Sequence, residues 1–195
     1  MTERGIALRV ETNVLPKIQS LCESLCLEEN EILKKARLLT GAYHEIVWGA
    51  LKNTGGVQGA NTKKYTEAVT YLSEFPPAID KKALQMNLLA IFQADWYEDL
   101  FKDALGFVAL YKHNSKVYTR MLTECYFSER EWSDKELQGE MDIERSSYFK
   151  RKKEAILLFG VALWGITVPQ KLNLPYAVDR QAAYLKLIGE NGALS

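Results

Sequence analysis

Charged side chains are sorted by sign along one short stretch of this chain. Residues 134–144 carry five acids and one base, whereas residues 145–154 carry five bases and one acid. Lys and Arg bind phosphate oxygens, and Arg and small polar side chains contact base edges. The basic half therefore has the residue types that bind a nucleic acid, and the acidic half would have to point away from it.

Two helices joined by a turn are predicted around the point where the sign changes. Ser133 and Glu136 have the spacing of a capping box, which starts a short helix at about 134–141. A brief connector follows, in which Ile143 can fill the angle between the two helices, and a longer helix begins near Arg145. This arrangement is a helix-turn-helix. The inward side of the longer helix is expected to carry Tyr148, the stem of Lys152, Ala155, Ile156 and Phe159.

The outer side of the second helix is the candidate DNA-binding surface. In a helix-turn-helix this helix enters the major groove, where some side chains contact base edges and others bind phosphates. Base edges are the expected contacts of Arg145, Ser146 and Ser147, and phosphates are those of Lys150, Arg151 and Lys153. A solvated helix face is the alternative interpretation, because most charge runs are no more than that. The expected surface residues are Arg145, Ser146, Ser147, Phe149, Lys150, Arg151 and Lys153.

The stretch EWSDKELQGEMDIERSSYFKRKKEAILLFG resembles the C-terminal helix-turn-helix of the ArpU-type and RinA-type phage transcriptional regulators, and it is similar to region 4 of sigma factors. The resemblance covers about residues 115–165. It implies a sequence-specific DNA-binding regulator of transcription, of phage or mobile-element type. The implied partner is double-stranded DNA, with RNA polymerase and a second copy of the chain as further candidates. The shared features are a tyrosine-bearing helix (Tyr118, Tyr126), WSDKEL, Ile143, Arg145, Ser146, Ser147, a Tyr-Phe pair, KRKKEA and a trailing apolar helix.

Glu144 stands at the start of the second helix, where that family often has Ser or Thr. These residues are better N-caps and can bind a phosphate, so Glu144→Ser is expected to tighten DNA binding and to stabilise the fold a little. The alternative function is a helical protein–protein adaptor that keeps the helix-turn-helix only as a scaffold. It is favoured if Glu144 and the acids before it border the outer face of the second helix, because their field would repel DNA.

Nearly the whole chain is predicted to be helical, so the fold class is all-α, with about eight or nine helices. Apolar residues recur at helical spacing, as they do over residues 14–26. Residues 1–112 are expected to form a helical region for oligomerisation or partner binding, and residues 113–195 a helix-turn-helix region with a C-terminal helix. That last helix, over about 176–188, is expected to pack back on the protein or to pair with another copy.

Two apolar segments indicate what is buried. Residues 79–94 are apolar on most sides and are expected to form a central, buried helix. Residues 155–168 are 14 residues without a charge, which is short of the about 20 that span a membrane. Pro169 is expected to end this run. We expect the run to be buried against the N-terminal region and the protein not to associate with a membrane.

The overall composition excludes several classes of function. Lys plus Arg and Asp plus Glu number 25 each, so any nucleic-acid surface must be local. The three cysteines do not make a disulfide framework and fit a reducing cytoplasm, and Cys22 and Cys26 are expected to be core thiols. No catalytic or phosphate-binding motif occurs, and His44 is expected to be partly buried and hydrogen-bonded. No enzyme activity, cofactor or metal is therefore predicted.

Overall fold

The structure is a computed structural model that describes residues 13–53, 62–91, 94–130 and 132–190. In these ranges the secondary structure is entirely helical and forms nine continuous helical segments, which confirms the predicted fold class. The helices are α1 (Leu15–Ser24), α2 (Glu29–Asn53), α3 (Thr62–Glu74), α4 (Lys81–Ile91), α5 (Ala94–Leu110), α6 (Ser115–Leu122) with the π-helical turn η1 (Thr123–Phe127), α7 (Asp134–Glu140), α8 (Arg145–Ala162) with the π-helical turn η2 (Leu163–Thr167) and α9 (Val168–Lys171), and α10 (Ala177–Glu190).

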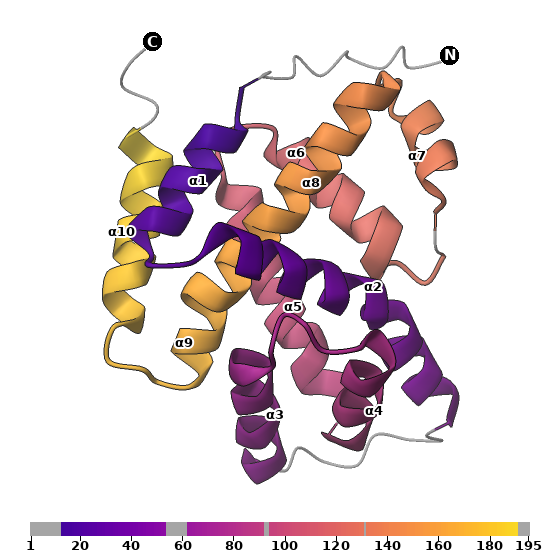
Figure 1. Ribbon diagram of the computed structural model, residues 1–195, viewed down its shortest axis with the longest axis vertical. Coiled ribbons are helices and arrows are strands. Elements are labelled where there is room, and N and C mark those ends of the chain that lie inside the picture. Colours follow the sequence, from indigo (N-terminus) through magenta and orange to yellow (C-terminus); the bar gives the residue numbers. More distant parts are fainter. Residues whose placement is uncertain (1–12, 54–61, 92–93, 131, 191–195) are drawn as a thin grey trace.

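Helix α8 runs through the middle of the molecule and packs against α1, α2, α5 and α6 (Figure 1). Every residue from 154 to 169 is buried. The prediction that the apolar run 155–168 would be buried against the N-terminal region is therefore confirmed. One hydrophobic core takes in residues from Val14 to Tyr184, and it continues past the turn at 111–114, where the domain boundary was expected. In the ranges that the structure describes, no helix is long and apolar enough to cross a membrane.

Two glycines, Gly160 in α8 and Gly165 in η2, allow neighbouring segments of the chain to approach closely. A Cβ added to Gly160 would lie 2.7 Å from Cγ2 of Ile32 and 3.1 Å from Cβ of Ala36 on α2. A Cβ added to Gly165 would lie 2.9 Å from Cδ1 of Leu25. Both distances to the branched side chains are shorter than real carbon–carbon contacts. The crossing of α8 over α2 therefore depends on the absence of a side chain at Gly160.

The expectation that Pro169 would end the apolar helix is wrong. The helix continues through η2 and α9 to Lys171. In a π-helical turn each N–H pairs with the carbonyl five residues earlier, so the α-helical ladder is already interrupted before Pro169. Pro169 then occupies the first turn of α9, where a missing N–H costs least.

Two further expectations about burial are corrected. Helix α4 is not central, because among residues 81–90, whose burial the structure describes, only Leu84 and Leu88, one turn apart, are buried, whereas Met86 is 63% exposed. One stripe is enough to hold α4 against α2 and α3. Cys22 is buried as expected, but Cys26 is exposed. It lies past the end of α1 with a φ of 54°, the left-handed conformation that often ends a helix.

We expect Gly160→Ala to destabilise the protein by about 1–2 kcal/mol. Overpacking a dense core costs about 1–3 kcal/mol, and the better helix propensity of Ala returns at most about 1 kcal/mol. The matched control is Gly106→Ala on α5, where an added Cβ has no atom of another residue within 4 Å. That change should stabilise the protein by up to about 1 kcal/mol. Urea unfolding of both variants tests this, and a Gly160→Ala protein as stable as the control contradicts the close packing.

Candidate nucleic-acid interface

Helices α7 and α8 and the turn between them are held on α6 by a second, smaller hydrophobic cluster. Leu137 of α7 and Tyr148 of α8 are both fully buried in it. Ile143, in the turn, packs against this cluster, as its predicted place between the helices requires. Asp142 turns the chain with a φ of 49°. The remaining buried members are Val117, Met121 and Cys125.

The predicted capping box begins α7. The backbone N–H of Glu136 donates to the Ser133 hydroxyl (3.3 Å), and the backbone N–H of Ser133 donates to the Glu136 carboxylate (2.9 Å). The Ser133 hydroxyl also donates to that carboxylate (2.6 Å). These hydrogen bonds lower the pKa of Glu136, the Ser133 hydroxyl being the largest cause. The start of α7 is therefore set by local hydrogen bonds.

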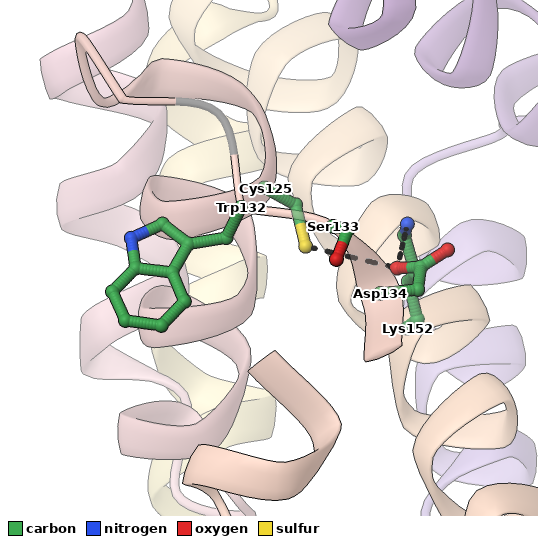
Figure 2. A pocket seen from close by; sticks show the side chains of 5 residues that line it. All are labelled: Cys125, Trp132, Ser133, Asp134 and Lys152. Carbon is green, nitrogen blue, oxygen red and sulfur yellow. Dashed lines mark hydrogen bonds and ion pairs between the residues drawn. The ribbon is translucent and has the colours of Figure 1, made fainter. Parts of the chain in front are cut away.

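Asp134, the first residue of α7, ties this helix to α8. Its Oδ1 accepts hydrogen bonds from the Lys152 ammonium (2.5 Å) and from the Tyr148 hydroxyl (2.9 Å). Figure 2 shows Asp134 and Lys152 together at a pocket of about 380 Å³, with Cys125, Ser133 and Trp132 as its other lining residues. We call Asp134 and its contacts with Lys152 and Tyr148 the anchor. It lies where η1, the start of α7 and α8 meet.

The electrostatics of this anchor favour the ion pair. Burial is the largest single influence on the pKa of Lys152 and would lower it. The hydrogen bond to Asp134 and the neighbouring Tyr126 and Cys125 together outweigh burial and raise the pKa above its ordinary value of 10.5. The ammonium also lies 5.0 Å from the centre of the Tyr126 ring. Burial raises the pKa of the Cys125 thiol, which makes the thiolate less available at neutral pH. The pocket therefore supports a structural tie and not a reactive cysteine.

Glu144 itself caps α8, at the position where Ser or Thr was expected to be the better cap. Its carboxylate accepts hydrogen bonds from the backbone N–H groups of Ser146 (3.1 Å) and Ser147 (3.4 Å), and from the Ser146 hydroxyl. These bonds, with the Ser146 hydroxyl as the largest cause, lower the pKa of Glu144 below its ordinary value of 4.5. A lowered folded-state pKa means that the cap stabilises the protein above pH 4.5 and loses this effect as the pH falls through the folded-state value.

The expected DNA-contacting residues do not all lie at the surface. Arg145, Phe149 and Lys150 are exposed, and Lys153 is partly exposed. Ser146 is also exposed and Ser147 partly so, but both are engaged by the Glu144 cap. The Arg145 guanidinium lies 5.9 Å from the centre of the Phe149 ring. The ridge on the first turns of α8 thus consists of Arg145, Phe149, Lys150 and Lys153.

Arg151 is the residue whose expected place is wrong. It is only 8% exposed, and its Nη1 donates to the backbone carbonyl of Ser147 (3.1 Å). Lys152, in contrast, points inward by its stem as predicted and ends at Asp134. Arg151 and Lys152 are adjacent, so the helical period alone did not decide which would be buried. Arg151 therefore leaves the set of candidate contact residues.

The acids of α7 are offset by partners beside them. Glu140 forms an ion pair with Arg120 of α6 (3.4 Å), and Glu136 lies 3.7 Å from Arg130. Asp134 is paired with Lys152. The separation of charge along the sequence is therefore reduced in space, because most of these acids have a base close by while the ridge of α8 stays basic.

The anchor at Asp134 is the part of this region that sequence reasoning missed. The capping box placed Asp134 in the first turn of α7, and the stem of Lys152 was expected inside. Their contact depends on the angle between α7 and α8, which neither local pattern contains. Comparisons of the chain with protein-family models, with curated proteins and with solved structures found no match. The resemblance to the ArpU-type and RinA-type regulators stays a prediction.

We expect Asp134→Asn to lower the free energy of unfolding by about 1–2 kcal/mol, because hydrogen bonds to charged groups contribute about 1.5–3 kcal/mol and this one is partly solvated. The change would also leave Lys152 without its carboxylate. Asp142→Asn is the matched control, because Asn also tolerates a positive φ and Asp142 is exposed. Equal urea midpoints for the two variants would show that Asp134 does not anchor α7.

Proposed function

We propose that this protein is a sequence-specific DNA-binding regulator of transcription, of phage or mobile-element type, with the first half of α8 in the major groove. The observation that carries the proposal is the exposed ridge of Arg145, Phe149, Lys150 and Lys153 on a helix that follows a short capped helix and a turn. The three acids of α7 each have a base beside them, which leaves the exposed cations of the ridge to attract a polyanion.

Each residue of the ridge suits a different contact. Arg145, in the first turn, can bind guanine O6 and N7 with two hydrogen bonds, and Phe149 can contact the methyl group of thymine. Lys150 and Lys153 are longer, flexible cations suited to phosphates. Arg145 and Phe149 already lie together. The proposal therefore assigns base readout to these two and positioning to the two lysines.

The second candidate function is a helical protein–protein adaptor that uses the helix-turn-helix as a scaffold. Glu144 is the observation that favours it. Its carboxylate occupies the N-terminus of α8, where a helix-turn-helix could otherwise hold a phosphate on its free N–H groups. An acid at this place would repel a phosphate backbone. The charge of Glu144 is therefore the feature that separates the two candidates.

The proposal includes further partners and a compartment. Double-stranded DNA is the main ligand, and RNA polymerase and a second copy of the chain are the protein partners that such a regulator would use. The three free thiols fit a reducing cytoplasm. The proposal assigns no residue to catalysis.

We expect duplex affinity to fall steeply with salt, because each phosphate contact releases counterions and contributes about −0.9 to the slope of log K against log salt. Lys150→Ala and Lys153→Ala should each flatten the slope by about one unit on all duplexes. Arg145→Ala should cost about 1–3 kcal/mol on duplexes selected from a random library and little on unselected DNA. Fluorescence anisotropy at several salt concentrations measures these values.

Lys82→Ala is the control and should leave the slope unchanged. Lys82 is an exposed lysine of α4, a helix that lies far from the start of α8 in Figure 1. A slope near zero, with no effect of any ridge substitution, would rule out DNA binding by α8.

We expect Glu144→Gln to tighten duplex binding roughly threefold at low salt, because it removes a negative charge next to the phosphates. The amide oxygen can still accept from the N–H groups of Ser146 and Ser147, so stability should change little. The gain in stability expected for Glu144→Ser is not retained, because Glu144 already caps the helix. Glu67→Gln on α3 is the control for the change in net charge. Equal affinities for both variants would favour the adaptor.

A further inference from the structure

Helix α10 lies at the edge of the molecule (Figure 1). It has an apolar stripe on its exposed side. Val178 is 74% exposed and Leu185 is 41% exposed. Ala182 and Gly189 are exposed as well. These four residues are separated by four, three and four positions, which is the spacing of the a and d positions of a coiled coil. They therefore form one narrow line along the helix.

Another side of α10 attaches it to the protein. Ala177 and Tyr184 are buried, and the Tyr184 hydroxyl donates to the backbone carbonyl of Phe107 on α5 (2.7 Å). Gln170 of α9 donates to the side chain of Gln181 (2.8 Å). These contacts hold α10 in place, so its stripe is presented by a helix that needs no ordering before it binds.

Two opposite charges lie on the same flank of the stripe. Asp179 and Lys186 follow Val178 and Leu185 by one residue, which places both at e positions, and both are exposed. In an antiparallel pair of helices the e flanks meet, so Asp179 of each copy would lie near Lys186 of the other. A parallel pair brings no such opposite charges together. The small side chains at Ala182 and Gly189 allow the two helices to approach closely.

We propose that α10 is a self-association surface, on which two copies of this chain pair as antiparallel helices about a two-fold axis. The two-fold axis makes each contact occur twice, including the pair of Asp179 with Lys186. Two helices of 14 residues bury less than the roughly 1,600 Å² of a standard stable interface, so the dimer forms reversibly with rising concentration.

The α10 surface would be the contact between the two copies of the chain that the proposed function includes. It rests on the proposed function only for the role of the dimer in DNA binding. Self-association is measured without DNA, so the dimer can fail while DNA binding holds, and the reverse.

Charge reversal tests the pairing most sharply. Sedimentation velocity of the full chain, from micromolar to near-millimolar concentration, should show a monomer–dimer equilibrium. Asp179→Lys and Lys186→Asp should each weaken the dimer by on the order of tenfold, because each change replaces two opposite-charge contacts with two like-charge contacts. The double variant should restore the dimer. An equal mixture of the two single variants should form a heterodimer, because it restores both opposite-charge pairs.

The apolar stripe is tested separately. Leu185→Ser should weaken the dimer by on the order of tenfold, whereas Met86→Ser, at a more exposed apolar residue of α4, should leave it unchanged. Circular dichroism confirms that α10 stays helical, since reversed charges at helix ends disfavour the helix. A chain that stays monomeric throughout, or a dimer that none of the α10 substitutions weakens, would overturn the proposal.

Discussion

The second half of α8 is surrounded by protein on every side, and this burial decides where its first half can point. A helix is a stiff rod, so fixing residues 154–169 in the core fixes the direction of the turns before them. The close approach of α2 at Gly160 sets the distance between α8 and α2. The ridge on α8 is therefore presented by the hydrophobic core itself, and no loop needs to hold it.

The anchor at Asp134 completes this arrangement at the exposed end. Buried apolar contacts are non-directional, so Leu137 alone would leave α7 free to roll on α6. The hydrogen bonds from Tyr148 and Lys152 to one carboxylate oxygen define a direction. The short helix α7 thus has a unique position beside α8, although it is only seven residues long. Its acids then lie beside the bases of neighbouring segments.

The parts of the structure that depend on neighbours in the sequence were predictable, and those that depend on distant neighbours were not. The capping box of Ser133 and Glu136, the following turn and the burial of the apolar run all follow from local spacing. The burial of Arg151 depends on which helices lie against α8, and Pro169 is tolerated because of the π-helical turn before it. The same limit explains α4, whose apolar composition resembles that of a central helix although only Leu84 and Leu88 are buried among residues 81–90. The exposure of Arg145, Phe149 and Lys150 was predicted from the spacing of the helix alone.

Helix α8 is exposed at its start and buried at its end, so the substitutions that it tolerates should also become fewer along its length. At the exposed positions of the first turns, such as Arg145 and Phe149, a side chain can be replaced with little consequence for folding, because it lies outside the hydrophobic core. In the enclosed half, even one additional methyl group at Gly160 or Gly165 would collide with a neighbouring side chain. Related chains would thus be expected to diverge in the ridge, and with it in whatever they recognise, while retaining the same enclosed half. The binding preference could then be exchanged independently of the scaffold, within a single continuous helix.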